Sequence, residues 1–302
     1  MPGAFNYQSL LLFRSDLSSK CFLHYTVPMK KTAQEIRILR KELQKTRQLE
    51  AKVLAKEIRG RGGFGITDKI REKIPEKAMT SLEVAFEKGF TLIFTKGDSL
   101  IDKMGIEKAR RQYEIYADSL DKMIYEETLK AVDKAAGSRS ALTKGITTAE
   151  GSGLGIFGLG LPDIPIFLAM LLKTSYEIAA AYGIDFRDER EKRYTLALFN
   201  TIFSEGHDKE AFSEECDAIG EAIDNWEDID TEIRQEDIEL VSNTLATDLL
   251  VAKFLQGFTF AGVIGGPINL HMVHKVSKIA KIKYKKRFLR RLLIASYDEH
   301  II

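Results

Sequence analysis

The hydrophobic residues of the chain recur mainly at spacings of three and four, the period of one face of an α-helix. Such stretches predict helices at residues 32–59, 75–97, 106–136, 164–182, 190–203, 209–224, 229–254 and 276–293. Alternation typical of a strand occurs only in T-L-I-F-T at residues 91–95, which is too short to prefer over a helix. We therefore predict an all-α protein built as a multi-helix globular domain.

Two apolar stretches interrupt this amphipathic pattern. The first, residues 151–172, holds a single charge, Asp163, within L-P-D-I-P, where two prolines forbid an ordinary helix interior. Its glycines predict a loop followed by a helix that begins near Ile164 and ends at Gly183, because glycine adopts the left-handed turn past a helix end. The second, residues 254–270, carries glycine and alanine four residues apart, a spacing that lets helix backbones approach closely.

Neither stretch has enough polar surface to face water, so we expect these two Gly/Pro-broken segments to pack together. Burial in a protein core is the preferred interpretation, because Asp163, five glycines and two prolines offset most of the apolar gain of entering lipid. Insertion at a membrane interface and a transmembrane span are the alternatives.

Changes in composition divide the chain into three predicted parts. Residues 1–28 show no sustained periodicity and precede a plausible start at Met29, so we expect a disordered or mis-assigned extension. Residues 29–65 predict a basic helical extension and a Gly-rich linker, because the apolar stripe of this helix is thin in its middle. Residues 66–302 are predicted to form the helical domain.

The overall composition is that of a globular protein with a core. The chain has 302 residues, of which 44% are hydrophobic and 29% charged. Its two cysteines cannot form a disulfide framework and lack the paired spacing of a structural zinc site. With no match to a signal peptide, these features predict a cytoplasmic protein.

The net charge of +1 conceals a strong segregation of charge along the chain. Residues 29–61 hold eleven basic and four acidic side chains, and residues 205–239 hold two basic and fifteen acidic ones. Residues 275–291 hold nine basic side chains and no acidic one. This layout bears on partners and association rather than on the fold.

The basic helix at residues 276–293 is the clearest functional signal. Cations surround one apolar stripe, and the candidate anion-binding residues are Lys278, Lys281, Lys285, Lys286, Arg287, Arg290 and Arg291. Such a helix can lie on an anionic membrane surface. Docking against an acidic partner, including the chain's own residues 205–239, and simple solvation are the alternatives. Nucleic acid is disfavoured because no aromatic stacking platform accompanies the cations.

A second candidate site consists of buried polar residues from the two apolar stretches: Asp163, Asn269, His271 and His274. His271 and His274 share a helix face, and two histidines with a carboxylate could hold a metal for a hydrolase. The alternative interpretation is that Asp163 caps the helix at Ile164 and that both histidines are packed or exposed. The spacing is too weak to assign a metal or another cofactor.

Other motifs do not indicate catalysis. Gly153, Gly155 and Gly158 match a dinucleotide fingerprint, but no strand precedes them and Pro162 interrupts the helix that this motif requires after its last glycine. The acidic residues around Trp226 lack the glycine of a calcium loop, and no hydrolase nucleophile motif occurs.

The chain resembles the EcsC protein family in three stretches. These are the glycines leading into L-P-D-I-P, I-A-A-A-Y-G-I-D at residues 178–185, and G-V-I-G-G-P-I-N followed by Y-K-K-R-F-L. The resemblance covers residues 74–293, leaves the basic helix before residue 60 outside, and transfers no catalytic residue. It implies a gene that accompanies an ABC transporter. We therefore expect a non-enzymatic, membrane-peripheral accessory or lipid-binding protein, with the metal-assisted hydrolase as the alternative.

Overall fold

The structure is a computed structural model that describes residues 31–58, 66–96, 103–122, 124, 126–137, 164–255 and 266–295. All the elements in these ranges are helices, which confirms the predicted all-α class. They are α2 (Ala33–Ile58), α3 (Ile66–Arg71), α4 (Glu76–Lys96), α5 (Lys103–Lys122), a helix at residues 126–137, α7 (Ile164–Ala181), α8 (Glu189–Phe203), α9 (Gly206–Asp224), α10 (Gln235–Leu255) and α11 (Gly266–Ile294).

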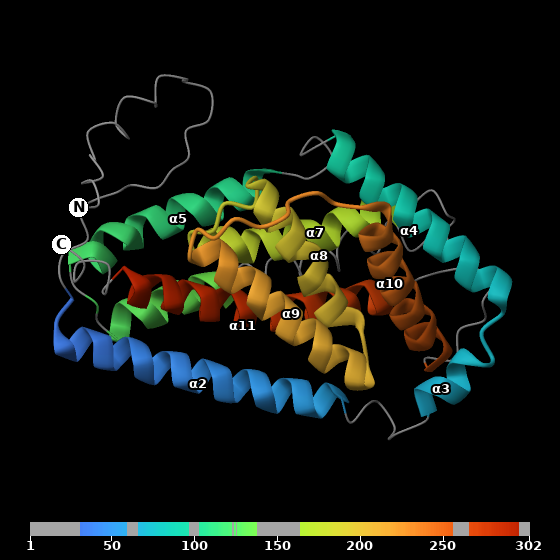
Figure 1. Ribbon diagram of the computed structural model, residues 1–302, viewed down its shortest axis with the longest axis horizontal. Helices are drawn as coiled ribbons and strands as arrows, with labels where there is room; N and C mark the ends of the chain where they lie inside the picture. Colours follow the sequence, from blue (N-terminus) through green and yellow to red (C-terminus); the bar gives the residue numbers. More distant parts are fainter. Residues whose placement is uncertain are drawn as a thin grey trace, which may run out of the picture.

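Helix α11 is the centre of the fold. It contacts α2, α7, α8, α9 and α10, and Figure 1 shows it running through the middle of the molecule with α2 along the lower edge. Its predicted apolar stripe is core, since Val276, Ala280, Tyr284 and Phe288 are each at most 3% exposed. Its other sides are covered as well, so four of its nine basic side chains are buried and the other five are partly buried.

Helix α7 is the most apolar element, and its end agrees with the sequence prediction. Gly183 has φ 71°, its N–H bonds to the carbonyl of Ala180, and the N–H of Ile184 bonds to that of Ala179. This pattern is a Schellman motif, which requires the left-handed conformation that glycine adopts easily. Among the described helices, α7 alone is long and apolar enough to cross a membrane, and 72% of it is buried within the fold.

Helices α7 and α11 run parallel, so they begin at the same end of the molecule. The hydroxyls of Ser175 and Tyr284 are 3.5 Å apart, and further along both helices the rings of Tyr182 and Phe288 lie 5.6 Å apart. Residues 151–163 and 256–265 lead directly into these two helices. Both segments lie outside the described residues, so their mutual packing stays a prediction.

Helix α2 is part of the same helical body as α11. It begins with a capping box, in which the Glu35 N–H donates to Thr32 Oγ1 at 3.2 Å and the Thr32 N–H donates to Glu35 Oε2 at 2.7 Å. Leu39 and Leu43 are buried in the cluster that also contains the apolar residues of α11. The described part of the predicted extension is therefore packed against the core, whereas the expected linker at residues 60–65 and the extension at residues 1–28 lie outside the description.

The acidic turn around Trp226 ends α9. The N–H of Trp226 bonds to the carbonyl of Ile223, and the N–H of Glu227 to that of Ala222, which is again a Schellman motif. Trp226 occupies the left-handed position with φ 60° and is 60% exposed, while Arg190 lies 5.0 Å from its ring centroid. A tryptophan thus takes a position that glycine usually fills.

Candidate functional site

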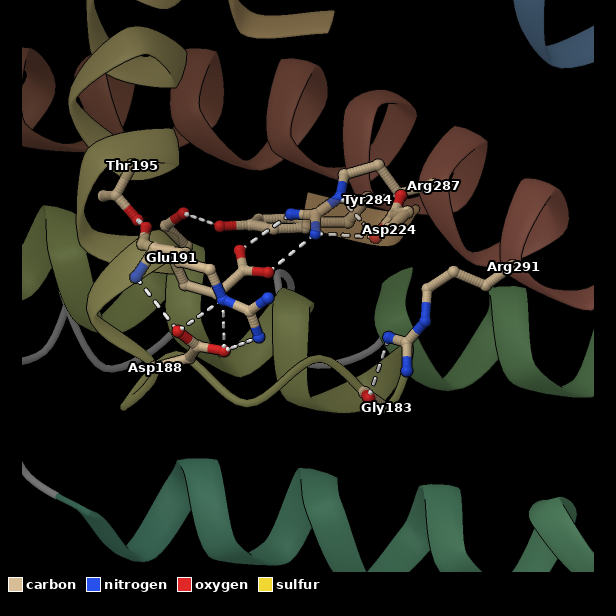
Figure 2. A network of polar contacts seen from close by, with 10 residues as sticks. Gly183, Asp188, Glu191, Thr195, Asp224, Tyr284, Arg287 and Arg291 are labelled. Carbon is tan, nitrogen blue, oxygen red and sulfur yellow. Dashed lines mark hydrogen bonds and ion pairs between the residues drawn. The ribbon is translucent and has the colours of Figure 1, made fainter. Parts of the chain in front are cut away.

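Arg287 is the central charge of a buried network. Its guanidinium is 3% exposed and donates two hydrogen bonds to the Glu191 carboxylate, at 2.6 and 2.7 Å. It also donates to Asp224 at 2.8 Å (Figure 2). Its Cζ lies 4.3 Å from the ring centroid of Tyr194. Burial opposes its charge, but the two carboxylates raise the pKa of Arg287 well above its ordinary value. Two anions thus hold one buried cation.

Helix ends bring these carboxylates together. Asp188 caps the N-terminus of α8 by accepting from the Arg190 N–H at 3.0 Å, which places Glu191 in the first helical turn. Asp224 is the last residue of α9. Tyr284 lies one turn before Arg287, and burial raises the pKa of its hydroxyl. The arrangement is shielded from water and has the partners of a structural ion network.

The lysines of α11 extend this network along the helix. Lys283 is 1% exposed and donates to Ser213 Oγ at 2.8 Å and to Asp217 at 2.7 Å, while Glu50 of α2 lies 2.8 Å away. Lys286 bonds to the same two carboxylates, Asp217 and Glu50. Buried charges need such partners, because an unpaired one would carry the full cost of desolvation.

A neighbouring group surrounds Lys209, which lies in the first turn of α9. Its ammonium donates to three carbonyl oxygens at the end of α8, those of Thr201 at 2.8 Å, Ile202 at 3.0 Å and Ser204 at 2.9 Å. Glu57 lies 3.2 Å away. Burial, together with the charge of a nearby lysine, lowers the pKa of Lys209 to about 8. The side chain thereby satisfies helix-end carbonyls that have no partner within α8.

The predicted anion-binding cations of α11 are engaged within the chain. The pairs are Lys278 with Glu57, Lys281 with Asp133, Lys285 with Glu42 and Asp133, Lys286 with Glu50 and Asp217, Arg287 with Glu191 and Asp224, and Arg290 with Glu221, while Arg291 donates to the Gly183 carbonyl. This differs from an exposed basic helix, because carboxylates from several other helices neutralise the charge. It corresponds to the alternative in which the basic helix docks within its own chain, and residues 205–239 supply some of the carboxylates.

The predicted buried polar site is only partly described. His271 is partly exposed and His274 exposed, both in the first turns of α11. Asp163 and the side chain of Asn269 lie outside the described residues. In the part of the chain that the structure describes, no group of three histidine, cysteine, aspartate or glutamate side chains could hold a metal ion.

Comparison with known proteins identifies the family. The sequence model of the EcsC protein family matches residues 33–289. The chain belongs to the EcsC protein family. It is 25% identical over 148 residues to Protein EcsC of Bacillus subtilis (strain 168), an alignment that covers 48% of this chain and 58% of that protein. No solved structure matches the chain.

The family match begins at residue 33 and therefore includes α2, which the sequence resemblance leaves outside. The contacts between α2 and α11 agree with this extent. Glu42 pairs with Lys285 at 2.9 Å and Glu57 with Lys278 at 3.0 Å, so α2 completes the charge balance of the central helix. In this EcsC protein α2 is a structural partner of α11 rather than an appendage.

The acidic and the basic side chains of α2 lie on opposite sides of the helix, which was not predicted from the sequence. Its four glutamates, Glu35, Glu42, Glu50 and Glu57, are buried or partly buried, whereas its seven cations are all exposed: Arg37, Arg40, Lys41, Lys45, Arg47, Lys52 and Lys56. A signal for this existed, because glutamates spaced by seven or eight residues fall on one helix face. Of these two helices, α2 rather than α11 therefore presents an exposed cationic surface in this EcsC protein.

Proposed function

We propose that this EcsC protein is a non-enzymatic accessory protein that binds the anionic cytoplasmic face of a cell membrane through the outer side of α2. The observation that carries the proposal is the separation of charge on α2, with its carboxylates turned toward the protein and its cations toward solvent. We name these seven exposed cations the α2 basic face.

The α2 basic face has the chemistry of an anionic-lipid contact. Each lysine or arginine near an anionic lipid surface contributes about 1 kcal/mol at physiological salt. Leu49 is 50% exposed on the same helix and adds apolar contact with the interface. Two of the cations, Lys41 and Lys45, also reach the carboxylates of Glu126 and Glu42, so the test below replaces other members of the face, Arg47, Lys52 and Lys56.

The family resemblance adds a place for this contact, the membrane surface beside a transporter. A protein whose gene accompanies an ABC transporter would meet such a transporter at the membrane surface, and α2 would hold it there. The apolar segments that lead into α7 and α11, which carry Asp163 as their single charge, would provide a second means of contact with lipid that is mainly apolar. The two kinds of contact differ in their response to salt, because only charge attraction is screened.

The test is flotation of the protein with lipid vesicles. We expect the unmodified protein to float with vesicles rich in phosphatidylglycerol, not with phosphatidylcholine vesicles, and to be released as salt is raised. Replacing Arg47, Lys52 and Lys56 with Gln should abolish flotation. Replacing the exposed acidic residues Glu210, Glu214 and Glu215 of α9 with Gln is the matched control and should not weaken it.

Two outcomes would overturn this proposal. One is the absence of binding to anionic vesicles at low salt by both the unmodified protein and the variant with Gln at positions 210, 214 and 215. The other is binding that survives both the α2 substitutions and high salt, which would assign the contact to the apolar segments instead.

A further inference from the structure

We propose that two copies of this chain form a reciprocal dimer in solution, in which α2 of each copy lies along α9 of the other. The inference does not depend on membrane binding, and the two contacts compete, because both use the α2 basic face. It rests on the outer side of α9, which carries the opposite charge to the α2 basic face. We name the exposed carboxylates on that side the α9 acidic face: Asp208, Glu210, Glu214, Glu215 and Glu221.

The α9 acidic face contains no exposed lysine or arginine. The helix contains one lysine and no arginine. That lysine, Lys209, is 1% exposed and is turned toward the carbonyls that end α8. Glu221 contacts Arg290 at 2.5 Å, and its side chain is still 50% exposed. Among its described side chains, the charge that α9 presents to solvent is therefore uniformly negative, as that of α2 is uniformly positive.

The two faces are also alike in size and relief. At about 1.5 Å per residue, α2 and α9 are roughly 39 and 28 Å long, so either can follow the other over several turns. Ala211 and Ala218 are exposed between the carboxylates of α9 and leave room for a neighbouring helix. Leu49, half exposed on α2, supplies apolar contact for such an approach.

The position of the two helices favours a closed pair. Helices α2 and α9 contact each other within one molecule, and Figure 1 shows them adjoining. When complementary surfaces adjoin on one protein, a two-fold rotation can place each on its counterpart in the second copy, so both contacts form at once. A stable interface buries about 800 Å² of each partner, and this arrangement contributes two helix faces per copy toward that area.

The association should be electrostatic. Charges of opposite sign on facing surfaces attract over about a Debye length, which is roughly 10 Å at 0.1 M salt and 3 Å at 1 M. In sedimentation equilibrium, the full chain should therefore show twice its monomer mass at low salt and return to the monomer mass at high salt.

A charge-exchange experiment tests the geometry. Variant one carries Arg47→Glu, Lys52→Glu and Lys56→Glu, and variant two carries Glu210→Lys, Glu214→Lys and Glu215→Lys. Each variant alone should be monomeric, because three reversed charges leave one of its two faces with mixed charge that no longer complements the other face. An equimolar mixture should restore the dimer with one copy of each variant, identified by its mass in native mass spectrometry.

Every outcome bears on the proposal. A wild-type protein that stays monomeric at low salt would overturn it, as would a mixture that forms no mixed dimer although both variants keep the helical circular dichroism of the parent. Species larger than a dimer would exclude the two-fold arrangement. Variant two keeps the α2 basic face, so its flotation with anionic vesicles tests membrane binding separately from dimerisation.

Discussion

The Cβ that Gly220 lacks would lie 2.8 Å from Cε2 of the buried Tyr194. It would also stand 3.0 Å from Cδ of Arg287, so α9 approaches the central ion network at a position where it has no side chain in the way. The close approach of α9 to the ion network therefore depends on the absence of a Cβ at position 220.

We expect Gly220→Ala to destabilise the protein by about 1 to 3 kcal/mol, the range for inserting atoms into a packed core. Urea unfolding followed by circular dichroism measures this change. Gly137→Ala is the control, because its Cβ would meet only the flexible end of Lys281 at 3.1 Å. Equal stability of the two variants would show that α9 can shift without cost.

Arg287 should be far more important to stability than its neighbour Arg290. Replacing Arg287 with Met leaves the carboxylates of Glu191 and Asp224 buried without their cation, and removing one partner of a buried pair typically costs about 3 to 5 kcal/mol. Arg290→Gln breaks a pair whose acid is 50% exposed, and such pairs contribute about 1 kcal/mol or less. The two free energies of unfolding, measured in the same denaturant, should differ accordingly.

The contact between α2 and α11 should weaken in acid. Burial raises the pKa of Glu57, but the charges of Lys209, Lys275 and Lys278 outweigh it and leave this pKa below its ordinary value of 4.5. The same balance of burial and lysine contacts, from Lys285 and Lys45, lowers the pKa of Glu42. Because the folded-state pKa values are lowered, the stabilisation is complete above pH 4.5 and is lost as the pH falls through them.

The measurement is the urea midpoint between neutral pH and about pH 3, the range in which carboxylates titrate. In Glu57→Gln this midpoint should be lower at neutral pH and should fall less steeply toward acid than that of the unmodified protein. Parallel curves for the two proteins would contradict the assigned role of Glu57.

The thiol of Cys216 should be inert in the folded protein. The residue is fully buried, and burial raises the pKa of its thiol to about 11, so little thiolate exists at neutral pH. A Cys21→Ser variant removes the other cysteine from the assay. Its reaction with Ellman's reagent should be slower by at least about 100-fold in buffer than in denaturant, and a comparable rate would show that α9 opens readily.

Local features were predictable from the sequence, whereas the partners of charged groups were not. The start of α7 at Ile164 and its end before Gly183 result from proline and glycine chemistry, which acts within a few residues. Lys286 and Glu50 are 236 residues apart, and composition alone treats a lysine as exposed. Burial of a cation depends on which carboxylates the fold brings to it, and periodicity does not encode that.

The position of α11 has a consequence for how the chain is made. The ribosome synthesises α11 after every helix that packs around it, so α2, α8 and α9 leave the ribosome with their inward carboxylates unpaired. Until α11 arrives, like charges on these helices repel one another and the apolar residues that it covers have no counterpart. Chains cut before Lys275 should therefore be degraded rather than accumulate as a smaller folded unit, and assembly of the protein must wait for its final described helix.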